Sequence, residues 1–206
     1  MPGRCALCRG APPRGDGLAC QTCLHRLRPP GLLPQSEHVE KYYSAFAYDG
    51  LARAAILRFK DRGATNTAKF FARAAYEAFP DLEDFDMLVP VPLHKNRLKS
   101  RGFNQARLFG QWLALEYQKP IYDILIRTRD TDRLYQVEQG RHEYLRGVFA
   151  AKPGADLLDK RILLVDDILT SGATTSECAA ALKMVGALTI SAITIAAATR
   201  RDHKGE

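Results

Sequence analysis

Short apolar runs alternate with longer segments of helical periodicity along most of the chain. The runs that predict strands are residues 39–48, 87–91, 124–127, 148–151, 162–165 and 188–198. Residues 51–59, 64–79, 106–115 and 176–185 instead repeat apolar side chains at the spacing of a helix. Strands that alternate with helices predict an α/β domain with a mostly parallel sheet, whose ligands bind at the carboxyl ends of the strands.

The stretch 161–176 joins a predicted strand to a predicted helix through polar residues. Asp166 and Asp167 follow the apolar run where the strand is expected to end, and a turn of small hydroxyl residues surrounds Gly172. The glycine lets backbone N–H groups approach an anion, and the helix start adds partial positive charge. The carboxylates can accept hydrogen bonds from sugar hydroxyls, directly or through a divalent cation. This stretch therefore predicts a site for a phosphorylated sugar.

Two other interpretations of the acidic pair compete with this one. Two aspartates after an apolar strand are also typical of a Walker B segment, but the chain has no G-x-x-x-x-G-K-[ST] sequence to accompany it. A strand that simply ends in polar residues before a helix cap is the plainer alternative. The complete string V-D-D-I-L-T-S-G-A-T resembles the phosphoribosyl pyrophosphate (PRPP) motif of type I phosphoribosyltransferases, which favours a ligand site.

Four of the five cysteines lie near the start of the chain. Cys5 and Cys8 form one C-x-x-C knuckle, and Cys20 and Cys23 form a second after eleven intervening residues. Four thiolates at this spacing suit tetrahedral zinc, and a redox-active pair is the alternative. The segment between the knuckles is too short for a core, so a metal would supply the folding energy. We predict a hairpin-like zinc ribbon with a proline-rich linker over 1–34 and a main domain over 35–206.

A cluster of basic residues follows the predicted strand 87–91. Four positive charges fall within seven residues, and a backbone-permissive Gly-Phe-Asn segment closes the cluster: Lys95, Arg97, Lys99 and Arg101, then Gly102 and Asn104. A loop of this kind after a parallel strand can bind a pyrophosphate or a nucleic-acid backbone, whereas the plainer alternative is a solvated turn. Lys60, at the break between two predicted helices, can also reach an anion.

Composition and charge narrow the classes of protein that fit. The 206 residues are 46% hydrophobic and 26% charged, as in soluble globular proteins, and the net charge of +7 favours phosphorylated metabolites or nucleic acid as partners. The first residues lack the apolar core of a signal peptide, and the apolar run 188–198 is shorter than the roughly 20 residues of a membrane span. These features predict a cytoplasmic protein without a membrane span.

The motifs in combination resemble the ComF family over essentially the whole chain. They are the two cysteine knuckles, V-P-V-P-L-H followed by R-G-F-N-Q-A, and the V-D-D-I-L-T-S-G-A-T string. The resemblance implies a zinc ribbon joined to a type I phosphoribosyltransferase-like domain, and a role in natural competence and DNA uptake. It also implies PRPP with Mg²⁺ as ligand, with the metal bridging pyrophosphate and ribose oxygens.

The resemblance further implies roles for particular residues. Asp166 and Asp167 would hold the ribose hydroxyls, as catalytic and PRPP-binding residues. The 5′-phosphate would lie in the loop of Ile168, Leu169, Thr170, Ser171, Gly172, Ala173 and Thr174. Residues 94–104 would face the pyrophosphate, and 127–146 would match the family's arginine-rich flexible loop. That loop often has an Asn two residues before R-G-x-F, where this chain has Tyr144.

Two functions remain open on the sequence. The first is transfer of phosphoribose from PRPP to a nitrogenous base, through an oxocarbenium-like transition state stabilised by charge placement. The second is a binding module that handles single-stranded DNA during uptake, alongside other DNA-uptake proteins, with weak or absent catalysis. A DNA-binding protein that senses PRPP would combine the two.

Overall fold

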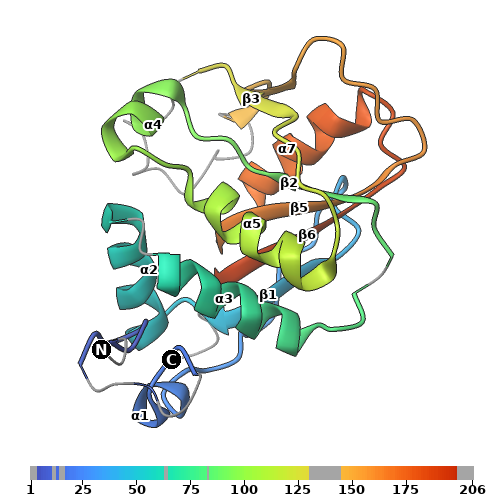
Figure 1. The fold of residues 1–206 in the computed structure, drawn as a ribbon. Coiled ribbons are helices and arrows are strands. Elements are labelled where there is room, and N and C mark those ends of the chain that lie inside the picture. The colour runs from blue at the N-terminus through green and yellow to red at the C-terminus, as the bar shows by residue number, and fades with distance from the viewer. Residues whose placement is uncertain are drawn as a thin grey trace, which may run out of the picture.

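A four-stranded parallel sheet forms the centre of the computed structural model (Figure 1). Its strands are β1 (Tyr42–Ala47), β6 (Thr189–Ala197), β5 (Arg161–Leu169) and β2 (Met87–Pro90), in that spatial order, and every neighbouring pair is parallel. A separate antiparallel pair joins β3 (Leu125–Arg127) to β4 (Phe149–Ala151). The predicted α/β class with a mostly parallel sheet is confirmed. The structure describes residues 4–10, 13, 17–62, 65–82, 84–129 and 145–198.

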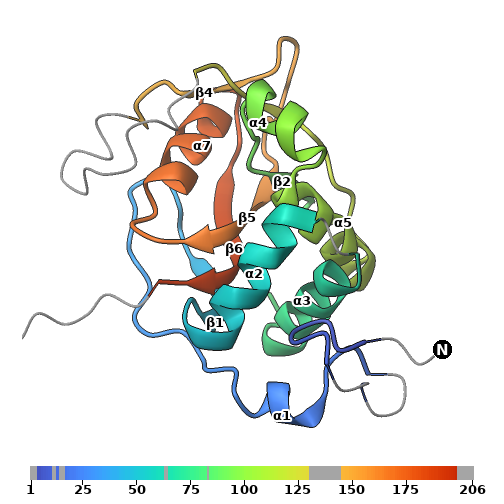
Figure 2. The same ribbon diagram turned by 90° about the vertical axis from the view of Figure 1, so that its left-hand side faces the viewer.

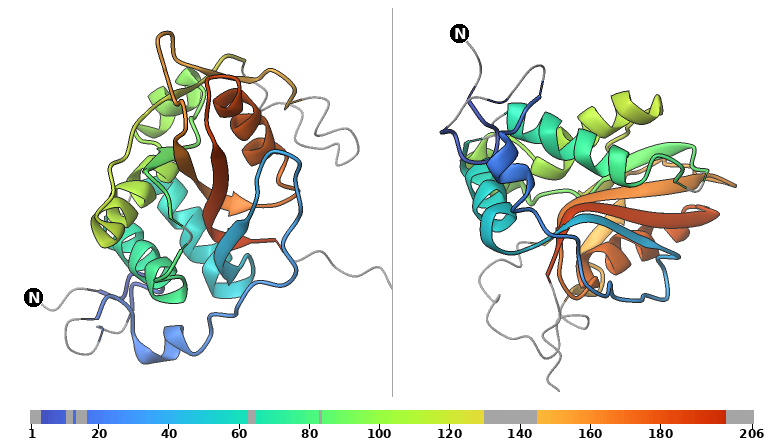
Figure 3. Two further views of the ribbon diagram at one scale, coloured as in Figure 1. Left: turned by 90° about the vertical axis from the view of Figure 1, so that its right-hand side faces the viewer. Right: turned by 90° about the horizontal axis from the view of Figure 1, so that it is seen from below.

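Helices cover both faces of the sheet (Figures 2 and 3). The helices in the described part of the chain are α1 (Gln21–Leu24), α2 (Gly50–Arg62), α3 (Thr65–Ala78), α4 (Lys95–Arg101), α5 (Gln105–Tyr117) and α7 (Ala173–Lys183). The view from below shows α3 and α5 on one face of the sheet and α7 on the opposite face (Figure 3). Among the described residues, none of the helices combines the length and the apolar composition that a membrane span requires.

The apolar run of β5 is continuous because both of its faces are buried. Leu163 and Val165 pack into the core beneath α3 and α5, whereas Ile162 and Leu164 pack into the core beneath α7. Successive side chains of a strand point to opposite faces, so a central parallel strand needs apolar residues at every position. Each fully buried side chain of this kind contributes about 1.5–3 kcal/mol.

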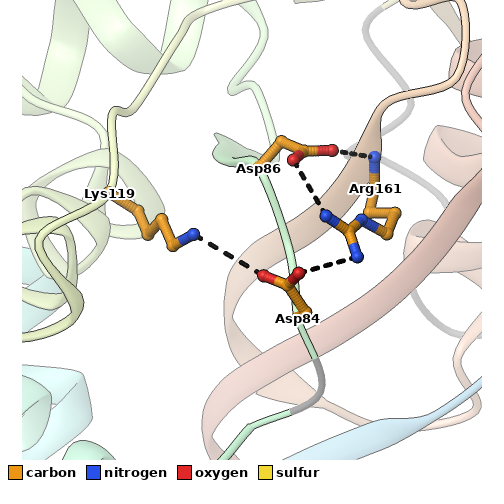
Figure 4. Close-up of polar contacts among 4 residues, drawn as sticks. All are labelled: Asp84, Asp86, Lys119 and Arg161. Carbon is orange, nitrogen blue, oxygen red and sulfur yellow. Dashed lines mark hydrogen bonds and ion pairs between the residues drawn. The ribbon is translucent and has the colours of Figure 1, made fainter.

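Charged residues tie the strands together at the end where β2 and β5 begin (Figure 4). The Arg161 guanidinium lies 2.7 Å from Asp84 and 3.3 Å from Asp86, and Lys119 lies 3.6 Å from Asp84. The backbone N–H of Arg161 also donates to Asp86 at 2.8 Å, and this bond, with the guanidinium, lowers the pKa of Asp86. This cluster fixes the start of two strands and leaves their opposite ends for ligands.

Candidate functional site

The two acidic residues predicted at the end of a strand lie inside one. β5 continues through Asp166 and Asp167 to Leu169, because its pairing with β6 extends beyond the apolar run to Asp166, Ile168 and Leu169. The apolar run predicts a strand that ends at Val165, and that boundary is wrong. Pairing with Thr194 of β6 holds the backbone of Asp166, and both aspartates stand near the carboxyl end of a central strand.

The carboxyl groups of this acidic pair occupy a charged and largely enclosed position. Lys60, from α2, places its Nζ 3.1 Å from Oδ2 of Asp167, whose side chain is 14% exposed. The backbone N–H of Asp167 donates to Oδ1 of Asp166 at 2.8 Å. Burial, and then the charge of Asp167, raise the pKa of Asp166 to about 7, although Lys60 and Arg127 oppose the shift. When both groups are ionised, their oxygens can accept from hydroxyls or bind a divalent cation.

The turn between β5 and α7 is braced from behind by Tyr42 of β1. Gly172 has a φ of 80°, and a Cβ at this position would lie 3.0 Å from the Tyr42 hydroxyl oxygen. Thr175 Oγ1 donates to the Gly172 carbonyl at 2.8 Å and lies 3.2 Å from the Tyr42 hydroxyl, which therefore donates to it. α7 begins at Ala173, earlier than predicted. The backbone N–H groups of its first turn therefore lie at the carboxyl end of β5, near the acidic pair.

The residues of the predicted phosphate loop differ in how they meet solvent. Leu169 and Ala173 are buried in the core beneath α7, so only their main chain is available to a ligand. The side chains that reach the surface are those of Ile168, Thr170, Ser171 and Thr174. The loop thus offers hydroxyls beside main-chain N–H groups, which is the donor set that a phosphate needs.

The basic residues after β2 form a helix instead of the predicted loop. The side chain of His94 caps the start of α4 by accepting from the N–H of Asn96, and Gly102, with a φ of 82°, ends the helix. Most residues between these caps are good helix formers. The concentration of charge nevertheless favours a loop when the sequence is interpreted alone. Asn104 then caps α5 by accepting from two backbone N–H groups, and its amide donates to the Val91 carbonyl at 2.9 Å.

Helical spacing sorts the four basic residues of α4 into two sets. Arg97 and Arg101, four residues apart, line the cavity that contains Asp166 and Asp167. Lys95 lines a neighbouring cavity of about 600 Å³, and Lys99 is exposed. A loop could have directed all four charges at one ligand, whereas the helix directs only the two arginines into the acidic cavity.

The acidic cavity has a volume of about 280 Å³ and gathers most of the predicted site residues. These are Lys60, Arg97, Arg101 and Asn104, with Asp166, Asp167, Ile168, Thr170 and Thr174. Tyr48 and Gln105 also line it, and the sequence interpretation missed both. Gln105 directly follows a predicted site residue in R-G-F-N-Q-A, which is the one signal that could have identified it. Residues 130–144, most of the predicted flexible loop, lie outside the described residues.

The four cysteines of the two knuckles converge on one point. The Sγ atoms of Cys5, Cys8, Cys20 and Cys23 all lie within 4.8 Å of one another, and none of these residues forms a disulfide. Tetrahedral zinc–thiolate bonds of about 2.3 Å place sulfurs roughly 3.8 Å apart, and the sulfurs of Cys8 and Cys20 are 3.9 Å apart. The cluster could hold a metal ion such as zinc.

The pKa values of Cys5 and Cys23 shift in opposite directions. Burial acts to raise the pKa of Cys5, but backbone hydrogen bonds, the strongest from Cys20 at 3.3 Å, outweigh it and lower the pKa to about 6. Burial and the surrounding thiols raise the pKa of Cys23. A cation that binds all four sulfurs would remove this conflict, because it stabilises every thiolate at once.

The cysteine knuckles pack against the helices of the main domain. The N–H of Ala6 donates to the Leu18 carbonyl at 2.9 Å, which ties the two knuckles together. Thr67 of α3 donates to the Ala6 carbonyl at 3.0 Å, and Arg58 of α2 donates to the Leu7 carbonyl. Leu7 is fully buried in the same core as α3 and α5. The domain boundary near residue 34 stays a prediction.

Comparison with known proteins finds one matching domain family and several relatives of similar sequence. The phosphoribosyl transferase domain family matches residues 104–205. Competence protein ComFC of Bacillus subtilis is 29% identical over 199 residues, which cover 93% of this chain and 76% of that protein. Competence protein F of Haemophilus influenzae is 30% identical over 64% of this chain and 61% of its own. DNA utilization protein YhgH of Escherichia coli O157:H7 is 30% identical over 51% of this chain and 46% of its own.

The parallel sheet, the turn at the end of β5 and the domain match define a phosphoribosyltransferase-like protein. The relatives named as competence proteins then identify the family. The chain is a ComF-family protein with a phosphoribosyltransferase-like domain, which confirms the family predicted from the motifs.

Proposed function

We propose that the acidic cavity at the end of β5 binds PRPP together with Mg²⁺. The observation that carries this proposal is the meeting of two carboxyl groups, a cationic wall and a hydroxyl-rich turn within one cavity. Asp166 and Asp167 supply acceptors for the ribose hydroxyls. Lys60, 3.1 Å from Asp167, balances their charge and holds that carboxylate in place.

The 5′-phosphate and the pyrophosphate of PRPP match two different walls of the cavity. The turn from Thr170 to Thr174 and the first N–H groups of α7 suit the 5′-phosphate. Arg97 and Arg101 of α4 suit the pyrophosphate, because a guanidinium can donate two parallel hydrogen bonds to one oxyanion group. Lys95 and Lys99 fall outside this division, since neither lines the acidic cavity.

The two donor sets of the chain suit different metals. Mg²⁺ prefers oxygen ligands, which the aspartates and the ligand's own oxygens provide, and when bound it neutralises the pyrophosphate. Four thiolates suit Zn²⁺, and a site whose four positions are all protein ligands is structural. We therefore assign zinc a structural role at Cys5, Cys8, Cys20 and Cys23.

A PRPP molecule held in this way is placed for transfer of its ribosyl group. The bond from C1 of the ribose to pyrophosphate breaks, a bond from C1 to a nitrogen of the acceptor base forms, and that nitrogen loses its proton. The carboxylates of Asp166 and Asp167 would stabilise the positive charge that develops on the ribose. The second candidate function, a metabolic transferase without a DNA role, is favoured by the carboxyl, cationic and hydroxyl groups that line one cavity.

The competence names of the relatives support a role in natural transformation, in which the protein handles single-stranded DNA in the cytoplasm. The net charge of +7 favours such a polyanion. Lys99, exposed on α4, and Lys95 beside it extend the cationic surface beyond the ligand cavity. A DNA strand bound there would lie close to the PRPP site, which would let one ligand influence the other.

Ligand-induced thermal shift tests the PRPP site. Saturating PRPP with Mg²⁺ should raise the Tm of the wild-type protein by roughly 5 °C or more, because a ligand at a hundred times its Kd adds about 2.7 kcal/mol. The Asp166→Asn/Asp167→Asn double variant keeps the shape of both side chains and should lose most of the shift. A wild-type Tm that does not move would contradict the proposal.

A salt titration of binding to a single-stranded oligonucleotide tests the DNA role. Each phosphate-contacting cation should contribute about 0.7 to the slope of log affinity against log salt. Lys99→Ala should lower the slope by about that amount. Lys160→Ala removes an exposed lysine from the opposite end of β5 and should leave the slope unchanged. Equal effects of the two variants would place DNA elsewhere, and a slope near zero in the wild type would argue against the DNA role.

A further inference from the structure

Gln105 is a buried polar residue in the acidic cavity whose amide group has an unused donor. Its side chain is 1% exposed, and its Nε2 has no hydrogen-bond partner among the described residues. It begins α5 and lines the same cavity as Asp166 and Asp167. A buried amide donor that loses its water partner without replacement destabilises the folded protein, so an unpaired one calls for an explanation.

The local structure does not need the Gln105 amide. Asn104 already caps α5, since its Oδ1 accepts from the N–H groups of Ala106 and Arg107 at 3.0 and 3.4 Å. The Asn104 amide also anchors the turn by donating to the Val91 carbonyl. The cap of α5 therefore does not require the side chain of Gln105. An apolar residue of similar size would satisfy the packing at position 105 at lower cost.

The position of Gln105 indicates which part of the ligand it meets. Gln105 and the two arginines of α4 all come from the segment that follows β2, whereas the hydroxyl turn follows β5. The segment after β2 is the wall that we assign to the pyrophosphate. An amide N–H donor matches the oxygens of that group, which only accept hydrogen bonds. It adds no charge to a cavity that already contains Lys60, Arg97 and Arg101.

We propose that the Gln105 side chain donates a hydrogen bond to the pyrophosphate group of bound PRPP. This inference rests on the proposed PRPP function and assigns one further binding residue to it. Like the cations, a neutral donor at this position stabilises the ionised oxygens of the pyrophosphate. Unlike them, it adds no positive charge to the pocket. Gln105 would thus discriminate pyrophosphate-bearing sugars from sugars with a single phosphate.

Two variants of Gln105 and one matched control test this role by calorimetry, with PRPP, pyrophosphate and ribose 5-phosphate as probes in the presence of Mg²⁺. Gln105→Leu should weaken PRPP and pyrophosphate binding about tenfold, the loss expected for one hydrogen bond to a charged group, and leave ribose 5-phosphate binding within about twofold. Gln105→Glu should weaken pyrophosphate binding further, because it places a negative charge against the ligand. Gln111→Leu, at an exposed position of the same helix, should change none of the three.

The stability of the ligand-free protein gives a second readout. Gln105→Leu should keep or raise the Tm, since it removes an unpaired buried donor, and this result also shows that the variant folds. Unchanged pyrophosphate affinity in both Gln105 variants, or an equal loss for ribose 5-phosphate, would overturn the assignment of Gln105 alone. A wild-type protein that binds neither PRPP nor pyrophosphate would instead overturn the proposed function itself.

Discussion

At the scale of single residues, Asp166 combines an electrostatic conflict with a central place in the candidate site. Its carboxyl group is forced next to Asp167 by the strand that carries both, and burial limits the help that water can give. A protein gains nothing in stability from such an arrangement. The conflict is understandable if a ligand or a cation completes the site, because either would stabilise the ionised pair.

The raised pKa of Asp166 predicts a pH-dependent loss of stability. Because this pKa is about 7 in the folded protein and about 3.8 in the unfolded chain, the folded state holds more protons between these values. The group therefore favours folding at low pH, and its contribution falls as the pH rises toward 7. Asp166→Asn should raise the Tm at pH 8 by about 3 °C or more and have little effect at pH 4.5.

Thermal unfolding of wild type and Asp166→Asn across this pH range checks the prediction. Asp81→Asn, at an exposed aspartate between α3 and β2, serves as control and should shift the Tm equally little at both pH values. If Asp166→Asn lowered the Tm more at pH 8 than at pH 4.5, the sign of the effect would be wrong.

Substitution of Gly172 measures the contact between Tyr42 and the turn that joins β5 to α7. Gly172 and Gly154 have nearly the same φ, 80° and 77°. A Cβ added at Gly172 would meet the Tyr42 hydroxyl at 3.0 Å, whereas one added at Gly154 would meet nothing within 4 Å. Gly154→Ala should cost about 1 kcal/mol from backbone strain alone. Gly172→Ala should cost about 1 kcal/mol more than that, measured by urea unfolding.

A double variant separates the contact from the strain at Gly172. In a Tyr42→Phe background the hydroxyl is gone, so Gly172→Ala should cost about as much as Gly154→Ala. An unchanged cost in that background would show that the Tyr42 contact does not limit the turn.

Among the helices and strands, α4 determines which basic residues can reach the ligand. Four charges in seven residues are visible in the sequence, but their division into two sets depends on the helical turn of about 3.6 residues. The caps at His94 and Gly102 make this segment a helix, and the sequence pattern identified neither of them as a cap. Because the sequence interpretation treats this segment as a loop and not as a helix, it also treats all four basic residues as equivalent.

The two sets of α4 residues should separate in binding experiments. Arg97→Ala/Arg101→Ala should weaken PRPP binding more than tenfold, because each removes charge-assisted hydrogen bonds worth about 1.5–3 kcal/mol. Lys95→Ala/Lys99→Ala removes the same charge from the same helix and should change PRPP affinity by less than about threefold. Calorimetric titration with PRPP and Mg²⁺ measures both, and equal losses would mean that net charge, not direction, governs binding.

Across the whole molecule, α2 connects the cysteine cluster to the acidic cavity. Arg58 donates to the carbonyl of Leu7, which lies within the first knuckle, and Lys60, two residues later, pairs with Asp167. Because both contacts come from one helix, the position of Lys60 depends on how the knuckles hold α2. The structural metal would in this way support the ligand site without touching it.

Metal removal should therefore affect both stability and PRPP binding. Chelation of zinc, or Cys8→Ser, should lower the Tm by about 5 °C or more, as expected when a metal supplies folding energy to a small segment. It should also weaken PRPP binding several-fold. Metal content and calorimetry measure the two effects.

Cys178→Ala is the matched control for thiol loss, since Cys178 is a buried residue of α7 and belongs to a different core cluster from the knuckles. It should leave the metal content at the wild-type value. Full PRPP affinity in a metal-free protein that remains folded would show that α2 does not transmit the effect.

The positions of the strands and the residue types of the candidate sites can be predicted from the sequence alone. The apolar runs locate the strands because a buried strand needs apolar residues, and the cysteine spacing indicates one metal cluster because four close thiols fit a tetrahedral ion. The Asp166–Thr174 string likewise predicts the phosphoribosyltransferase-like domain, and the domain match over residues 104–205 contains that string.

Which of these residues meet depends on the tertiary structure. Lys60 reaches Asp167 because α2 packs beside the end of β5, and no local pattern encodes a contact across such a separation in sequence. The burial of Gln105 and the bracing of Gly172 by Tyr42 have the same origin. Local periodicity reports which face of an element is apolar, whereas the partner of that face depends on how the whole chain packs.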